Sequence, residues 1–231
     1  MIDTVIFDLD GTLLNTLDDL KDSTNFALRN FGCPERSLEE VRCFVGNGVK
    51  KLIERALPGG AENPDFEDCL QLFKENYAQN MYNKTAPYDG IRELLQTLCR
   101  YGFKVAVVSN KFDMAVKNLC KTYFDGLVQV AIGESENVRK KPAPDSVFKA
   151  MELLKAGPET SIYCGDSDVD VQTAKNSGLK CIGVTWGFRS RELLQQEGAD
   201  YIVDAPYEIA ELLSAGTVSY THLRAHETPE H

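Results

Sequence analysis

Residues 5–14, "VIFDLDGTLL", place two carboxylates and a glycine at the end of an apolar run. Asp8 and Asp10 are two residues apart, and in an extended segment such residues point to the same side. One carboxylate could attack the phosphorus of a phosphate ester, while the other handles the proton of the leaving group and then activates water. A glycine lets the chain turn closely past a phosphate. We therefore interpret Asp8 as the nucleophile, Asp10 as acid and base, and Gly11 and Thr12 as phosphate-binding residues.

Polar residues also follow other strand-like runs. "KVAVVS" (104–109) leads to Ser109 and Asn110, and Lys141 lies in "KKPAPD", shortly after the weaker strand candidate "LVQVAIG". Ligands of open parallel sheets bind beyond the carboxyl ends of the strands, so these residues should lie near Asp8. Hydroxyl and amide donors with a lysine would neutralise charge on phosphate oxygens. We expect Ser109 and Lys141 to assist catalysis and, together with Asn110, to bind phosphate.

A second group of acids follows the run "SIYCG" (161–165), which leads to Asp166 and Asp170. Several carboxylates in one crevice repel one another unless a cation lies between them. A set of oxygen ligands without histidine or cysteine suits a hard ion, Mg²⁺ in particular. We predict Mg²⁺ as the cofactor, with Asp8 and Asp166 as ligands. For Asp170 the choice between direct ligation and a first-turn acid favoured by the helix dipole stays open.

The elements that must position these residues are short β-branched runs separated by helical patterns. The runs cover residues 4–9, 104–109, 161–165, 180–184 and 201–203. Continuous apolar strands that alternate with amphipathic helices indicate a parallel sheet covered on both faces. We predict a doubly wound, Rossmann-like α/β core.

One long stretch, from about residue 15 to residue 85, shows helical patterns and no convincing strand. Roughly seventy residues are too many for one crossover connection. We predict an α/β core domain of residues 1–14 and 86–215, an inserted helical cap domain of residues 15–85, and a disordered or added tail of residues 216–231. The "GNG" of Gly46, Asn47 and Gly48 could present backbone amides to an anion. Arg42 and Lys50 could pair with a substrate carboxylate or merely face solvent.

Composition excludes several classes of function. The net charge of −10 disfavours nucleic acid and anionic membranes as partners, and no apolar run approaches the eighteen or so residues of a membrane span. Seven scattered cysteines and the lack of an export signal at the N-terminus suggest a cytoplasmic protein. The sequence leaves open whether it is a monomer or a homodimer, and the partner that we expect is a small-molecule phosphate ester. All three histidines, His222, His226 and His231, lie in the final ten residues. Catalysis by histidine is therefore not expected.

Four segments together carry a resemblance to a known family. "DLDGT", "VVSNK", "KPAP" and "GDSDVDVQTAKNSG" follow the order and spacing of the motifs of haloacid dehalogenase-like hydrolases. Within that superfamily, "FVGNGVKKLI" and "GVTWGFRSRELL" are similar to segments of phosphoglycolate phosphatases. The resemblance implies a helical cap, Asp8 as nucleophile, Asp10 as acid and base with its carbonyl on Mg²⁺, Asp166 as a ligand and Asp170 as a metal support. Many relatives carry an acidic residue and a serine where this chain has Asn15 and Thr16.

These observations predict a Mg²⁺-dependent phosphomonoester hydrolase that acts through an aspartyl phosphate on a small phosphorylated acid, with 2-phosphoglycolate as the best single candidate. Alternatives on the same core are a pyrophosphatase, a nucleotide or sugar phosphatase and a β-phosphoglucomutase-like enzyme. A receiver module that accepts phosphate also uses clustered aspartates and a lysine on a parallel fold. Such a module would be about half as long, and its accepting aspartate would not lie on the first strand.

Overall fold

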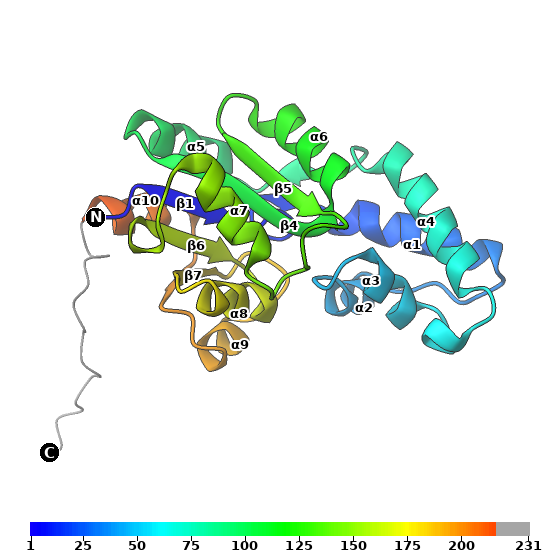
Figure 1. Ribbon diagram of the computed structural model, residues 1–231. Coiled ribbons are helices and arrows are strands. Elements are labelled where there is room, and N and C mark those ends of the chain that lie inside the picture. Colours follow the sequence, from blue (N-terminus) through cyan, green and yellow to red (C-terminus); the bar gives the residue numbers. More distant parts are fainter. Residues whose placement is uncertain (216–231) are drawn as a thin grey trace, which may run out of the picture.

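The chain is described here by a computed structural model, which covers residues 1–215 (Figure 1). The predicted tail and its three histidines lie outside the described residues. Six strands form one parallel sheet in the order β5-β4-β1-β6-β7-β8. Their bounds are β1 (Thr4–Phe7), β4 (Lys104–Phe112), β5 (Val130–Glu134), β6 (Ser161–Gly165), β7 (Lys180–Val184) and β8 (Tyr201–Val203). The predicted doubly wound α/β core is confirmed.

Two strand ends differ from the prediction. β1 ends at Phe7 instead of residue 9, because the carbonyl of Leu9 already accepts hydrogen bonds from the N–H groups of Leu13 and Leu14, so the chain has turned. β4 continues to Phe112, three residues beyond the predicted end, because Phe112 still pairs with β5. At the carboxyl ends, where we expect the chemistry, β4 is therefore longer than predicted and β1 is shorter than predicted.

Helices cover both faces of the sheet. Successive residues of β1 point to opposite sides, so Val5 and Phe7 enter one apolar cluster and Ile6 enters the other. The first cluster includes side chains of α5 (Ile91–Arg100), α6 (Asp113–Phe124) and α10 (Pro206–Ser214). The second includes those of α7 (Asp145–Leu154), α8 (Asp168–Asn176) and α9 (Arg191–Gln196). A short 3-10 helix, η2 (Pro158–Thr160), leads into β6.

A separate group of helices lies beyond one end of the sheet (Figure 1). It consists of α1 (Leu17–Asn30), α2 (Leu38–Phe44), α3 (Val49–Ala56), the short η1 (Gly60–Glu62) and α4 (Phe66–Asn80). On α4, the rings of Phe73 and Tyr77 stack with centroids 5.5 Å apart, and both side chains are fully buried. The helical insert predicted for the fold is present.

The two ends of this helical segment lie side by side. β2 (Leu14–Asn15) and β3 (Ala86–Pro87) pair antiparallel as a two-residue ribbon. Asn15 is thus in a strand, although the sequence pattern showed none from residue 15 onward. The exact domain boundaries stay a prediction. None of the helices within residues 1–215 combines the length and the apolar composition that a membrane span requires.

Candidate active site

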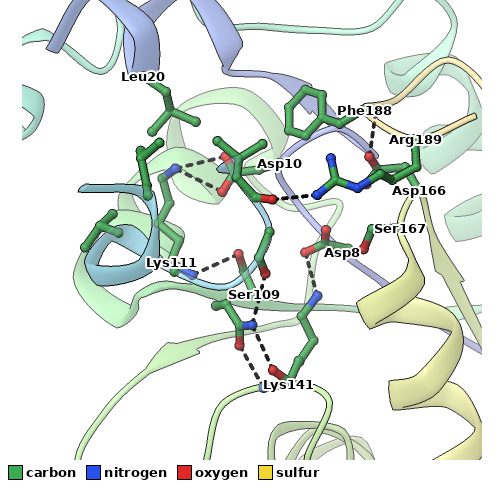
Figure 2. Close-up of a pocket in the computed structure, with 16 residues that line it drawn as sticks. Asp8, Asp10, Leu20, Ser109, Lys111, Lys141, Asp166, Ser167, Phe188 and Arg189 are labelled. Carbon is green, nitrogen blue, oxygen red and sulfur yellow. Dashed lines mark hydrogen bonds and ion pairs between the residues drawn. The ribbon is translucent and has the colours of Figure 1, made fainter. Parts of the chain in front are cut away.

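A cavity of about 60 Å³ lies where the carboxyl ends of β1, β4 and β6 meet the helical segment (Figure 2). β1 lies between β4 and β6 in the sheet, so the three strand ends are adjacent. Its polar lining residues on the sheet side are Asp8, Asp10, Ser109, Asn110, Lys111, Lys141, Asp166 and Ser167. The structure therefore brings together residues that are up to 159 positions apart in the chain.

Three buried carboxylates form the centre of this group. Asp8, Asp166 and Asp170 each offer a ligand atom within 4.8 Å of those of the others. Burial, followed by repulsion from Asp170, raises the pKa of Asp8 well above its ordinary value and the pKa of Asp166 to about 7. The three carboxylates form a set of oxygen donors with uncompensated negative charge. A hard divalent cation such as Mg²⁺ would neutralise that charge. These residues fit the predicted metal site.

Asp166 is oriented by the chain that follows β1. Its Oδ1 accepts a hydrogen bond from Oγ1 of Thr12 at 2.9 Å, and its Oδ2 accepts one from the N–H of Phe188 at 2.7 Å. Gly11 has a φ of +87°, and a Cβ there would lie 2.4 Å from Oδ2 of Asp166. The hydroxyl of Thr12, which was predicted to bind phosphate, thus donates to this acid, and Gly11 is required for close packing against the acid; phosphate binding by Thr12 stays a prediction.

Lys141 is buried between two of the acids. Its Nζ lies 2.8 Å from Oδ1 of Asp8 and 2.8 Å from Oδ1 of Asp170. Burial alone would lower the pKa of this ammonium, but the two carboxylates outweigh burial and raise the pKa. Asp170 also accepts hydrogen bonds from Tyr163 and from both the N–H and the hydroxyl of Ser167. Lys141 thus stays charged beside Asp8, while both oxygens of Asp170 are occupied by donors.

Asn110 connects three parts of the site. Its Oδ1 accepts a hydrogen bond from the N–H of Lys141 at 2.7 Å, and its Nδ2 donates to the carbonyls of Lys141 and Gly46. Its side chain therefore fixes the backbone of Lys141 and holds the loop before α3. Ser109, the residue before it, lines the cavity and accepts a hydrogen bond from the N–H of Lys111.

The sequence interpretation missed Lys111. Its buried Nζ lies 2.9 and 3.0 Å from the two carboxylate oxygens of Asp10, and 4.8 Å from the ring centroid of Tyr77 on α4. The residue was present in the quoted segment "VVSNK". Ser109 and Lys111 are two apart on β4, so strand alternation directs both to the same side. That spacing was the signal that could have identified it.

On the helical side, the predicted residues are only partly brought to the cavity. Gly46 and Gly48 line it, but the Oδ1 of Asn47 accepts a hydrogen bond from Arg55. Neither Arg42 nor Lys50 lines the cavity. Lys50 lies 3.7 Å from Glu67 on the surface, and Arg42 lies 3.6 Å from Glu39 in the preceding turn of α2.

A basic residue of the core lies at the cavity where Arg42 and Lys50 were expected. Arg189, in the loop after β7, lines the cavity and donates hydrogen bonds of 2.8 Å to the carbonyls of Arg42 and Val45. These two carbonyls lie at the C-terminal end of α2, where helix carbonyls lack intrahelical partners. Arg42 and Val45 lie 147 and 144 positions before Arg189 in the chain. No local sequence pattern indicates contacts between residues so far apart.

Comparison with known proteins agrees with this geometry. Residues 5–184 match the haloacid dehalogenase-like hydrolase family. A phosphoglycolate phosphatase from Pseudomonas putida KT2440 is 34% identical over 206 residues, which cover 87% of this chain and 75% of that protein. A solved structure from Lactobacillus delbrueckii, of a protein provisionally named phosphoglycolate phosphatase, is similar with a TM-score of 0.87 and 34% identity, covering 91% of this chain and 98% of that one. CbbY from Rhodobacter sphaeroides, solved in complex with phosphate, is similar with a TM-score of 0.74 and 27% identity, covering 90% of this chain and 96% of that one. The chain is therefore an enzyme that belongs to the haloacid dehalogenase-like hydrolase family.

Proposed function

We propose that this enzyme is a Mg²⁺-dependent phosphatase that hydrolyses a small phosphorylated acid, with 2-phosphoglycolate as its best candidate substrate, through a phosphorylated Asp8. The observation that carries the proposal is the position of Asp8 at the cavity, 2.8 Å from the Lys141 ammonium and beside the other buried acids. The fixed ammonium offsets the negative charge of a phosphoryl group, so that the neighbouring carboxylate can approach the phosphorus atom.

The proposed reaction has two displacements at phosphorus. An oxygen of Asp8 attacks the phosphorus, the bond from phosphorus to the ester oxygen breaks, and Asp10 gives its proton to the departing oxygen. Asp10 then takes a proton from water, whose oxygen attacks the phosphorus and breaks its bond to Asp8. Inorganic phosphate and the free carboxylate of Asp8 result. Ser109 and Lys141 bind the phosphate oxygens in both steps.

The side chains of Asp8 and Asp166, with the backbone carbonyl of Asp10, would hold Mg²⁺. When bound, the ion would supply positive charge that neutralises the phosphate and the clustered acids. We propose that Asp170 supports the site indirectly, because each of its oxygens accepts two hydrogen bonds, from Lys141, Tyr163 and Ser167. Each oxygen of Asp166 accepts only one, which leaves a lone pair for a metal. Asp170 would then orient the lysine and the loop after β6.

The substrate proposal rests on the size and lining of the cavity. Leu20, Val45, Val49 and Leu52 close it on the helical side, and the volume of about 60 Å³ favours a compact ester over a nucleotide. We propose that residues 15–85 act as the cap, whose closure excludes bulk water while substrate is bound. The names of the Pseudomonas and Lactobacillus relatives support 2-phosphoglycolate in particular.

A panel of phosphate esters, assayed with Mg²⁺ and with EDTA, tests the proposal. We expect the highest kcat/KM for 2-phosphoglycolate, loss of activity with EDTA and recovery when Mg²⁺ is returned. Preference for pyrophosphate, nucleotides or sugar phosphates would refute the choice of substrate. Activity that survives EDTA would refute the requirement for a metal.

A further inference from the structure

The proposed substrate carries a second anion, its carboxylate, and this inference rests on the proposed function. The phosphate group would lie against Asp8 and Lys141, so the carboxylate would extend toward the helical side of the cavity. That side is lined by Leu20, Val45 and Leu52, each at most 5% exposed. A carboxylate left among such side chains without a partner would be strongly destabilised. Recognition therefore requires a cation at this side.

Three cationic side chains line the cavity: Lys141, Lys111 and Arg189. Lys141 contacts the carboxylates of Asp8 and Asp170, and Lys111 contacts both oxygens of Asp10 at 2.9 and 3.0 Å. The charge of each lysine is thus matched by carboxylates of the protein itself. Neither lysine offers an uncompensated charge to a second substrate anion.

Arg189 differs from both lysines in its partners. Its Nη1 and Nη2 donate to the backbone carbonyls of Arg42 and Val45, which are neutral groups. Its nearest carboxylate is that of Asp168, 3.4 Å from Nε, and 37% of the Asp168 side chain is exposed to solvent. A guanidinium has five N–H groups, so two remain after these three contacts. Figure 2 shows the guanidinium among the residues that line the cavity, between Phe188 and Asp8 in that view.

We propose that Arg189 binds the carboxylate of the substrate and so determines the preference of the enzyme for phosphorylated acids. The two carbonyl contacts hold the planar guanidinium in one orientation, which reduces the entropy lost when it pairs with an anion. The same contacts tie the loop after β7 to the C-terminal end of α2. A bound carboxylate would therefore contact a group that belongs to the core and already touches the cap.

The test compares 2-phosphoglycolate with the phosphate ester of glycolamide, which replaces the carboxylate by a neutral amide of similar size. The measured quantity is kcat/KM for 2-phosphoglycolate divided by kcat/KM for the glycolamide ester. It is determined for the wild type, for Arg189→Gln and for Arg189→Lys. Arg191→Gln is the matched control, because Arg191 lies on the surface two positions away and pairs with Asp204. Thermal unfolding of each variant establishes that it is folded.

We expect Arg189→Gln to lower this ratio by about 10- to 100-fold, because the loss of a hydrogen bond to a charged group usually changes an equilibrium or rate constant by about that factor. Arg189→Lys should retain part of the preference, and Arg191→Gln should retain all of it. If kcat/KM for both esters falls equally in Arg189→Gln, the residue only holds the cap and the inference is wrong. If the wild type hydrolyses both esters equally well, no carboxylate is recognised and the inference is wrong, while the phosphatase proposal stands. Failure of the wild type on every phosphate ester would instead refute the proposed function.

Discussion

The two sides of the cavity are built on different principles. On the core side, Asp8, Lys141, Asp166 and Asp170 are buried, and each has a polar or charged partner at 2.9 Å or less. On the cap side, Leu20, Val45, Val49 and Leu52 present apolar side chains from α1, α3 and the end of α2. An interlocked set of charges tolerates few changes, whereas an apolar surface can change shape at small cost. We therefore propose that the core side carries out the chemistry and that the cap side and Arg189 select the substrate.

The largest effect should come from the proposed nucleophile on the core side. Asp8→Asn keeps the size of the side chain but replaces the charged carboxylate by a neutral, weakly nucleophilic amide, and we expect kcat to fall by at least about 10⁴-fold. The fold should persist, because a neutral group relieves the repulsion by Asp170 and Asp166. Steady-state assays and thermal unfolding measure the two quantities, with the surface variant Asp22→Asn as control. Full activity of Asp8→Asn would exclude the covalent intermediate.

A second change tests whether the core side is strained by its own charge when no metal is bound. The pKa of Asp166 is raised to about 7, so the folded protein favours the protonated acid. The stability that this preference contributes is fully present below the ordinary pKa of 3.8 and is lost as the pH rises through 7. The asparagine in Asp166→Asn does not titrate, so this variant does not lose stability in this way as the pH rises. With EDTA, its advantage over the wild type in free energy of unfolding should grow by about 3 kcal/mol between about pH 5 and about pH 8.

Urea unfolding of both proteins at the two pH values measures this difference. Added Mg²⁺ should stabilise the wild type more at the higher pH, because protons and the cation compete for the same oxygens. An advantage of Asp166→Asn that does not depend on pH would show that the carboxylates are already compensated without a metal.

A third change acts where the two sides meet. Lys111 extends from β4, holds the carboxylate of Asp10 and lies against the ring of Tyr77 on α4. Lys111→Met keeps the apolar stem but frees Asp10 to rotate, so we expect kcat to fall by about 10²-fold with KM changed less than about threefold. Lys111→Arg should recover part of kcat, because it restores a cation beside Asp10. Lys117→Met, on the exposed face of α6, is the control. A rise in KM without a fall in kcat would assign Lys111 to substrate binding instead.

The sequence predicted the core side well because its residues follow strands and are of a distinct chemical type. Asp8, Ser109 and Asp166 each come directly after an apolar run, and parallel strands must bring such ends to one edge of the sheet. The sheet itself followed from the same runs. Lys111 was missed because the segment was interpreted only as far as Asn110, although β4 continues beyond it.

The cap side could not be predicted in the same way. Arg42 and Lys50 were considered as partners of a substrate carboxylate, yet Arg42 pairs with an acid of its own helix and Lys50 with one on α4. Arg189 enters the cavity only because the loop after β7 folds over Asp166 and reaches the end of α2. Such contacts depend on how the helical segment lies against the core, and helical periodicity alone does not determine that arrangement.

The smallest effect should come from the cap side. Val49→Ala removes two methyl groups from the first turn of α3, at a half-buried position that lines the cavity. We expect kcat for 2-phosphoglycolate to change less than about threefold, because no group that contacts the phosphate moves. The added space should raise kcat/KM for a bulkier ester, such as 3-phosphoglycerate, by about threefold to tenfold relative to 2-phosphoglycolate. Steady-state kinetics with both esters measure this shift, and Val138→Ala, at a buried position that does not line the cavity, serves as control. A fall in kcat for both esters as large as that of Lys111→Met would show that the cap side takes part in the chemistry, and that the two sides are not separable.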